Sequence, residues 1–188
     1  MTAAFVGGVA VPVAEIDERE RMLRAGDRAA ALPRPDTSEG RQLRRWLTQL
    51  VTAERVVALE NAGAEHVPDL QDVLPDMAAQ LEIGSIAAAV LATEAGRAAF
   101  ARVTAGVGVT DIDIVAYHRR NPGRFAARRT DVVDFARARP LIAAHLGAAA
   151  RRRAFRLWLD ARCAELVALS PGYEHPGDPR QPDNTHKH

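Results

Sequence analysis

The sequence predicts an all-α domain that carries a short N-terminal β-hairpin and an extended C-terminal strap. Three observations lead to this prediction. Residues 39–61 and 140–169 repeat apolar side chains at helical spacing. Residues 5–12, FVGGVAVP, place apolar residues on both sides of a Gly-Gly pair, which is typical of a tight hairpin. Residues 172–188, GYEHPGDPRQPDNTHKH, contain almost nothing apolar after Tyr173 and therefore cannot pack as a helix.

Length and composition fit one globular domain followed by a tail. The chain has 188 residues, of which 47% are hydrophobic and 26% charged, so a sizeable core can form. We expect a helical domain at residues 1–170 and a Pro- and His-rich tail at residues 171–188. The one cysteine, Cys163, excludes an internal disulfide, and we expect it to be an unreactive thiol within a helix.

Neither a membrane span nor a secretion signal is evident in the sequence. The longest apolar run, residues 83–92, is about half the length that a bilayer requires. Residues 1–20 lack a basic leader and become charged before an apolar segment develops. We therefore expect a cytoplasmic protein, and the abundance of alanine and arginine is typical of a GC-rich bacterial genome.

The N-terminal half alternates helices with Pro-rich breaks. A first helix is expected after Pro12, and Pro33 and Pro35 force extended backbone beyond it. Thr37 or Ser38 then caps the clearest helix of the chain. Its apolar residues recur at i, i+3, i+4, i+7 and i+8: Leu43, Trp46, Leu47, Leu50 and Val51.

The C-terminal half shows the same signals. Residues 77–93 predict a helix that is interrupted near Gly84, and a short helix follows over residues 93–103. Thr110 caps the segment DIDIVAYHRR, and Asn121-Pro122 ends it. We expect the last long helix to begin near Pro140, because proline suits a first helical turn, and to end at Ser170-Pro171-Gly172.

Four stretches, taken in order, resemble the N-terminal domain of bacterial SurA-type peptidylprolyl isomerases and foldases. FVGGVAVPVAEID is similar to the opening motif of that family, and RQLRRWLTQLVTAERVV is similar to its long second helix. VTDIDIVAYHRRNPGRF resembles the motif T-D-x-x-hydrophobic-x-x-Y-x-x-x-P-x-x-F, with Tyr117, Pro122 and Phe125 in place. RPLIAAHLGAAARRRAFRLWLDARCAEL resembles the returning C-terminal helix. The resemblance covers most of residues 5–168 and implies a SurA/trigger-factor peptide-binding-like fold.

The sequence departs from that family in two places. Gly7 stands where the family usually has asparagine. The parvulin catalytic domain of the family follows the position of Phe125, where only residues 126–138 are present here, far too few for such a domain. The resemblance therefore implies a non-catalytic, chaperone-like module without prolyl isomerase activity. Its partner would be an extended peptide or a partner protein, held on a concave and mostly apolar helical surface.

The alternative is a small-molecule enzyme that uses the helical cradle together with the tail. A cyclase, dehydratase or lyase of bacterial natural-product biosynthesis would be an example. No nucleophile elbow, phosphate-binding loop or dinucleotide-binding motif is present. Under either hypothesis the candidate cradle residues are aromatic or histidine: Trp46, Tyr117, His118, His145, Trp158 and Tyr173. For the candidates that lie on apolar helical stripes, the competing explanation is that they pack in the core and bind no ligand.

Arginines concentrate in one segment of the chain. Residues 119–162 hold twelve arginines and three aspartates, a local charge of 12 − 3 = +9 in a chain of net charge +1. Such a segment suits an acidic peptide or an acidic carrier protein better than nucleic acid, for which no recognition motif is present. The competing explanation is pairing with acids elsewhere in the chain. The candidate residues for an anionic partner are Arg119, Arg120, Arg124, Arg128, Arg129, Arg151, Arg152 and Arg153.

The tail combines metal-ligand side chains with regularly spaced prolines. His175, Asp178, His186 and His188 offer imidazole and carboxylate groups that suit Zn, Fe, Ni or Cu. Their spacing matches no closed zinc site. Prolines at every third position favour a semi-rigid strap, which Tyr173 could anchor on the core. We prefer a strap without metal and keep the metal site as the alternative.

Overall fold

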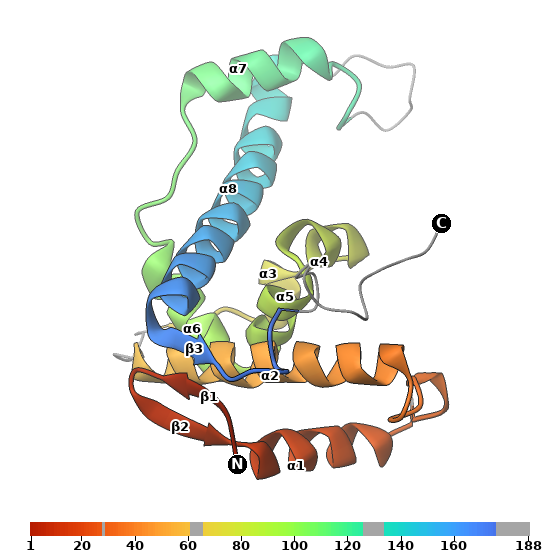
Figure 1. The fold of residues 1–188 in the computed structure, drawn as a ribbon. Helices are drawn as coiled ribbons and strands as arrows, with labels where there is room; N and C mark the ends of the chain where they lie inside the picture. The colour runs from red at the N-terminus through yellow and green to blue at the C-terminus, as the bar shows by residue number, and fades with distance from the viewer. Residues whose placement is uncertain (28, 61–65, 126–133, 176–188) are drawn as a thin grey trace, which may run out of the picture.

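The computed structural model describes residues 1–27, 29–60, 66–125 and 134–175. In these ranges the chain is mostly helical, with one small β-sheet, as the sequence predicted (Figure 1). No helix in the same ranges is long and apolar enough to span a bilayer.

The elements follow the chain in a simple order. The strands are β1 (Thr2–Val6), β2 (Val9–Pro12) and β3 (Val167–Leu169). A single turn of 3-10 helix, η1 (Ala29–Ala31), separates the first two α-helices. The α-helices are α1 (Val13–Arg24), α2 (Ser38–Leu59), α3 (Leu70–Val73), α4 (Met77–Ile83), α5 (Ser85–Leu91), α6 (Glu94–Val103), α7 (Asp111–Arg120) and α8 (Phe135–Leu166).

The sheet joins the two ends of the helical domain. Gly7 and Gly8 have φ of 55° and 81°, so both turn positions of the predicted hairpin take the left-handed conformation that glycine tolerates. The strand order is β2-β1-β3, and Val6 pairs with Val167 on the other side of β1. The sequence predicted helix as far as Ser170. Instead α8 ends at Leu166, and the next three residues form an antiparallel strand.

A first core lies between the sheet and the helices α1 and α2. Its fully buried side chains include Val6, Val11, Ile16 and Leu47. Ion pairs flank this core: Glu15 with Arg55, Glu54 with Arg19, and Asp17 and Glu20 with Arg44. The acids of α1 are therefore paired with arginines of α1 and α2, and not with the basic segment of α8.

A second core fills the space between α2, α5, α6 and the C-terminal half of α8. Phe155 is fully buried there, and its ring lies 5.6 Å from the rings of both Phe100 and Trp158. The sheet and the helices α1 to α6, with the part of α8 that packs on them, form what we call the body.

The arm consists of α7 and the N-terminal half of α8, which extends away from the body (Figure 1). At 32 residues, α8 is about 48 Å long. The arm has a small core of its own, formed by Ile114 of α7 and by Ala138 and Ile142 of α8. The sequence predicted that this helix begins near Pro140. It begins earlier, at Phe135, because the Asp134 side chain caps it, and Pro140 lies inside the helix.

Two helices begin with the same T-x-x-G sequence. The Thr93 Oγ1 accepts a hydrogen bond from the Gly96 N at 3.0 Å and donates one to the Val90 carbonyl oxygen at 2.7 Å. That carbonyl packs against the glycine, so a Cβ at Gly96 would lie only 2.0 Å from it. Thr37 and Gly40 repeat the arrangement at the start of α2. Glycine is therefore required at both positions.

We expect alanine to have opposite effects at two helical glycines. Gly96→Ala should lower the free energy of unfolding by about 1–3 kcal/mol, because its Cβ collides with backbone. Gly147→Ala, where no atom lies within 4 Å of the new Cβ, should raise it by about 0.5–1 kcal/mol. Urea denaturation followed by circular dichroism measures both values. Shifts of the same sign would contradict this account of the caps.

Candidate functional site

An open apolar groove of about 590 Å³ is formed on the body by α2, α3, α4 and α5. We call it the apolar groove. It is lined by Trp46, Leu70, Leu74, Met77, Gln80, Leu81, Ser85, Ala88, Ala89 and Ala92. Three of its large side chains are exposed: Leu70 by 41%, Met77 by 65% and Leu81 by 76%. None of its lining residues carries a charge.

The short helix α4 presents different side chains to the core and to the groove. Ala79 and Ile83 are buried against the second core, whereas Met77 and Leu81, one turn apart, are exposed. The Asp76 carboxylate caps α4 by accepting a hydrogen bond from the Ala79 N at 2.8 Å. This helix is apolar on more than one face, and only the inner face is covered by the described residues.

The floor of the apolar groove is fixed by a side-chain hydrogen bond. The Trp46 Nε1 donates to the Ser85 Oγ at 3.0 Å, which joins α2 to the start of α5. Gly84, with φ of 88°, separates α4 from α5 in a conformation that other residues rarely adopt. The sequence predicted this break and proposed Trp46 as a cradle residue.

A second hollow, of about 350 Å³, lies on the other side of Ser85, between α2, α5 and α8. We call it the polar hollow. Its polar lining residues are Gln49, Ser85, Arg156, Asp160, Cys163 and His175, and Ile83, Ile86 and Leu159 are among its apolar ones. The Gln49 Nε2 is buried and has no hydrogen-bond partner among the residues of the described ranges. The Arg156 Nε lies 3.8 Å from the Asp160 Oδ2.

Cys163 is poorly suited to nucleophilic chemistry in this hollow. Burial raises the pKa of its thiol to about 11, and the negative charge of Asp160 acts in the same direction. The thiol is therefore protonated at neutral pH. This agrees with the unreactive thiol that the sequence predicted.

A third hollow, of about 520 Å³, separates α4 from the arm. We call it the arm hollow. Its charged and titratable lining residues are Asp76, Glu82, Arg124, His145 and Arg152. The His145 ring lies 5.5 Å from the Tyr117 ring and 6.1 Å from the Phe125 ring, measured between centroids. Three residues that the sequence proposed as site residues, Arg124, His145 and Arg152, therefore line one hollow.

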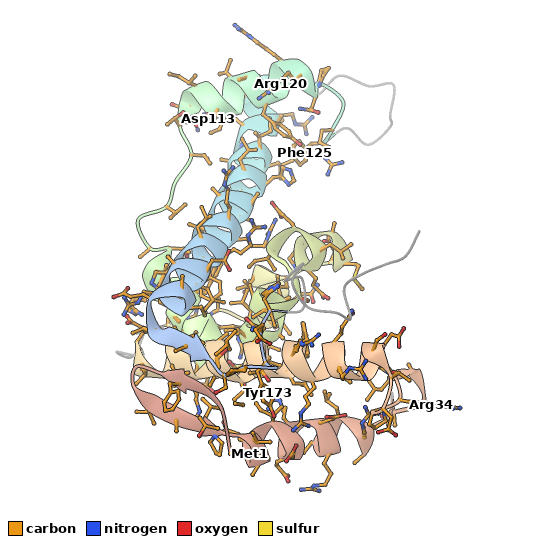
Figure 2. All side chains as sticks on the ribbon, viewed as in Figure 1. Met1, Arg34, Asp113, Arg120, Phe125 and Tyr173 are labelled. Atoms are coloured by element: carbon orange, nitrogen blue, oxygen red, sulfur yellow. The ribbon has the colours of Figure 1, made fainter. Side chains whose placement is uncertain are left out.

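The six predicted cradle residues do not line one cavity. Tyr117 and His145 are neighbours on the arm, where His118 contacts a different ring, that of Phe135, at 5.3 Å. Trp158 packs in the second core, as the competing explanation had it. Tyr173 packs on the first core, with the Arg44 guanidinium 5.9 Å from its ring. Figure 2 shows this separation, with Phe125 and Arg120 on the arm and Tyr173 on the body.

Two of the predicted anion-binding arginines have partners within the protein. The Arg151 Nε donates to the Thr104 Oγ1 at 2.9 Å. Arg152 is buried, and its Nε and Nη2 both donate to one carboxylate oxygen of Glu82, at 3.0 and 2.8 Å. Pairing within the chain therefore accounts for part of the basic segment.

Other arginines of that segment remain available to a partner. Arg119, Arg124 and Arg153 are exposed, and none of them forms an ion pair with a residue that the structure describes. Arg120 is also exposed, and its Nε donates to a carbonyl oxygen one turn back in α7. Arg128 and Arg129 lie outside the described residues.

The predicted metal ligands fall mostly beyond the described part of the chain. His175 lies on the wall of the polar hollow, whereas Asp178, His186 and His188 lie outside the described residues. Within the described ranges, no group of three or more His, Cys, Asp or Glu side chains could hold a metal ion. A metal site formed by the tail stays a prediction.

The sequence analysis did not identify Met77 and Leu81 of the apolar groove or Gln49 of the polar hollow as site residues. In the segment DLQDVLPDMAAQLEIG, Met77 and Leu81 are spaced four residues apart, in addition to the buried pair Ala79 and Ile83. This second apolar face of the helix was the signal available in the sequence. Gln49 carried no such signal, because only the packing of α5 and α8 against α2 buries its amide.

Comparison with known protein families gives a match only for the N-terminal segment. A family of unknown function, DUF7158, matches residues 2–39, which span the β-hairpin, α1, η1 and the first two residues of α2. No curated protein matches the chain, and no solved structure does. The matched segment contains none of the residues that line the three hollows.

The raised pKa of Cys163 predicts slow alkylation. At pH 8 the folded protein should react with iodoacetamide roughly 100-fold more slowly than the urea-unfolded protein, because a pKa of about 11 in place of 9.0 leaves about 100-fold less thiolate. Intact-mass spectrometry over time measures the rate. The rate for the folded protein should continue to rise up to about pH 11, and a plateau near pH 9 would contradict the assignment.

Proposed function

We propose that the protein is a non-catalytic, chaperone-like module that holds extended polypeptide segments, with their apolar side chains in the apolar groove. The observation that carries this proposal is the exposure of Leu70, Met77 and Leu81 around one groove without charged lining residues. Large apolar side chains gathered on one surface usually mark a binding site, because isolated ones are common but contiguous ones are not.

The chemistry of the groove favours apolar ligands of varied sequence. Covering a side chain such as Leu81 contributes about 1.5–3 kcal/mol, so three such contacts contribute about 5–9 kcal/mol before the cost of association is subtracted. Met77 has an unbranched and adaptable side chain, which suits partners of different shape. The small side chains of Ala88 and Ala89 on α5 and of Ala92 just after it let a partner backbone come close to the groove floor.

The order of the elements supports a relation to SurA-type N-terminal domains. In those domains a hairpin and a long second helix open the fold, and a helix ending near a Pro-x-x-Phe sequence precedes the catalytic insert. Here α7 ends just before Pro122 and Phe125, and α8 returns to the hairpin through β3. With only residues 126–134 between Phe125 and α8, we propose that prolyl isomerisation has no place in the function.

Exposed arginines on α7, just after α7 and on α8 would add an electrostatic contribution to binding. Arg119, Arg124 and Arg153 are exposed and without ion pairs to described residues, so acidic residues of a client or of a carrier protein would find partners there. Interactions of this kind mainly raise the association rate and are weakened by salt. The apolar groove would supply most of the affinity.

A second candidate function is small-molecule catalysis in the polar hollow. The observation that favours it is that His175, Asp160 and Cys163 line the same hollow. Because the Cys163 thiol is protonated at neutral pH, acid–base chemistry would fall to His175 and Asp160.

A charge placed in the apolar groove should weaken polypeptide binding. The probe is fluorescently labelled, reduced and carboxymethylated α-lactalbumin, a permanently unfolded polypeptide, and fluorescence anisotropy measures its dissociation constant. Leu81→Glu should weaken binding at least about 10-fold, because it removes an apolar contact and buries an unpaired carboxylate.

Leu157→Glu is the matched control for this experiment. Leu157 is 53% exposed on α8 and lines none of the three hollows, so its substitution should change the dissociation constant less than about twofold. Both variants should retain the helical circular dichroism spectrum. Equal loss in the two variants, or no binding by the unaltered protein, would refute the proposal.

A further inference from the structure

The side-chain amide of Gln49 has an unusual environment. Its Nε2 is buried in the wall of the polar hollow, and no described residue accepts a hydrogen bond from it. A buried donor without an acceptor is destabilising, and native proteins almost always supply a partner, a water molecule or a ligand at such a position. The hollow is therefore suited to a group with an acceptor oxygen.

The polar hollow adjoins the apolar groove at Ser85. This residue lines both, and its Oγ accepts the hydrogen bond from the Trp46 Nε1. Its own hydroxyl hydrogen finds no acceptor among the described residues. Two donors, the Gln49 amide and the Ser85 hydroxyl, therefore belong to residues that line the hollow.

Charges at the hollow limit the kind of ligand. Arg156 and Asp160 both line it, 3.8 Å apart and partly exposed, so a free anion would meet the carboxylate and a free cation would meet the guanidinium. A neutral group with both a carbonyl oxygen and an N–H offers an acceptor to the two donors and a donor to the carboxylate. The carbonyl would accept from Gln49 and Ser85, and the N–H would donate to Asp160.

We infer that the polar hollow binds main-chain amide groups of the same extended peptide whose side chains occupy the apolar groove. This inference rests on the proposed function and deepens it. The groove would select apolar side chains, and the hollow would hold the backbone, which every polypeptide has. Such a division suits a module that binds many sequences, because affinity from the backbone is independent of the side chains.

Nuclear magnetic resonance on ¹⁵N-labelled full-length protein tests the inference directly. The probe is N-acetyl-leucine N-methylamide, a capped residue with two amide groups, and its methyl ester is the matched compound that lacks one N–H. The Gln49 side-chain NH₂ signals should shift on titration with the amide. The ester should bind about three- to ten-fold more weakly, because Asp160 loses its donor.

Matched variants separate the hollow from the groove. Gln49→Met keeps the volume and removes the donor, so the amide should bind about three- to ten-fold more weakly, with the Ser85 backbone signal as the readout. Gln42→Met makes the same change on the same helix at a residue that lines neither the hollow nor the groove, and there the affinity should change less than about twofold.

Two results would overturn the inference. One is that the Gln49 side-chain signals do not shift although the signals of the groove residues show saturation with the probe. The hollow would then contain solvent and not the probe. The other is equal affinity for amide and ester. If Gln49→Met also leaves α-lactalbumin binding unchanged while Leu81→Glu abolishes it, the proposed function stands and only the backbone site fails.

Discussion

The pairing of β3 with β1 is the interaction on which the rest of the structure depends. It ties the end of α8 to the N-terminal hairpin, so the long helix must cross the body and pack on α2 with its C-terminal half. The N-terminal half of α8 extends beyond the body, and in the described ranges α7 and flanking residues such as Val109 and Phe125 pack against it. The arm is thus a consequence of where the chain closes (Figure 1).

The same closure explains why the apolar groove is open. The core between α2 and α8 is filled by α5, α6 and one face of α4, and nothing in the described chain covers the outer face of α4. Met77 and Leu81 are exposed for this reason. The same packing explains the polar hollow, because α5 and α8 bury the Gln49 amide against α2 but provide no acceptor for it among the described residues. One packing arrangement therefore leaves an apolar and a polar surface side by side.

Local sequence signals predicted the elements well and their assembly poorly. The Gly7-Gly8 turn, the stripe of α2, the break at Gly84 and the Thr110 cap are each encoded by neighbouring residues. Strand β3 was missed because its partner lies at the other end of the chain, and the pairing decides its conformation. The candidate site suffered in the same way. The sequence analysis selected aromatic and histidine residues by their type, but packing distributes them over separate parts of the fold, and of those residues only Trp46 lines the apolar groove.

The most direct test of peptide binding in the apolar groove uses the methionines. The chain has three, Met1, Met22 and Met77, of which Met22 is 58% exposed on α1 and only Met77 lines the groove. With ¹³C-methyl methionine labelling, titration with reduced, carboxymethylated α-lactalbumin should shift and broaden the Met77 methyl signal and leave the Met1 and Met22 signals in place. A shift confined to Met22 or Met1, or no shift at saturation, would contradict the account.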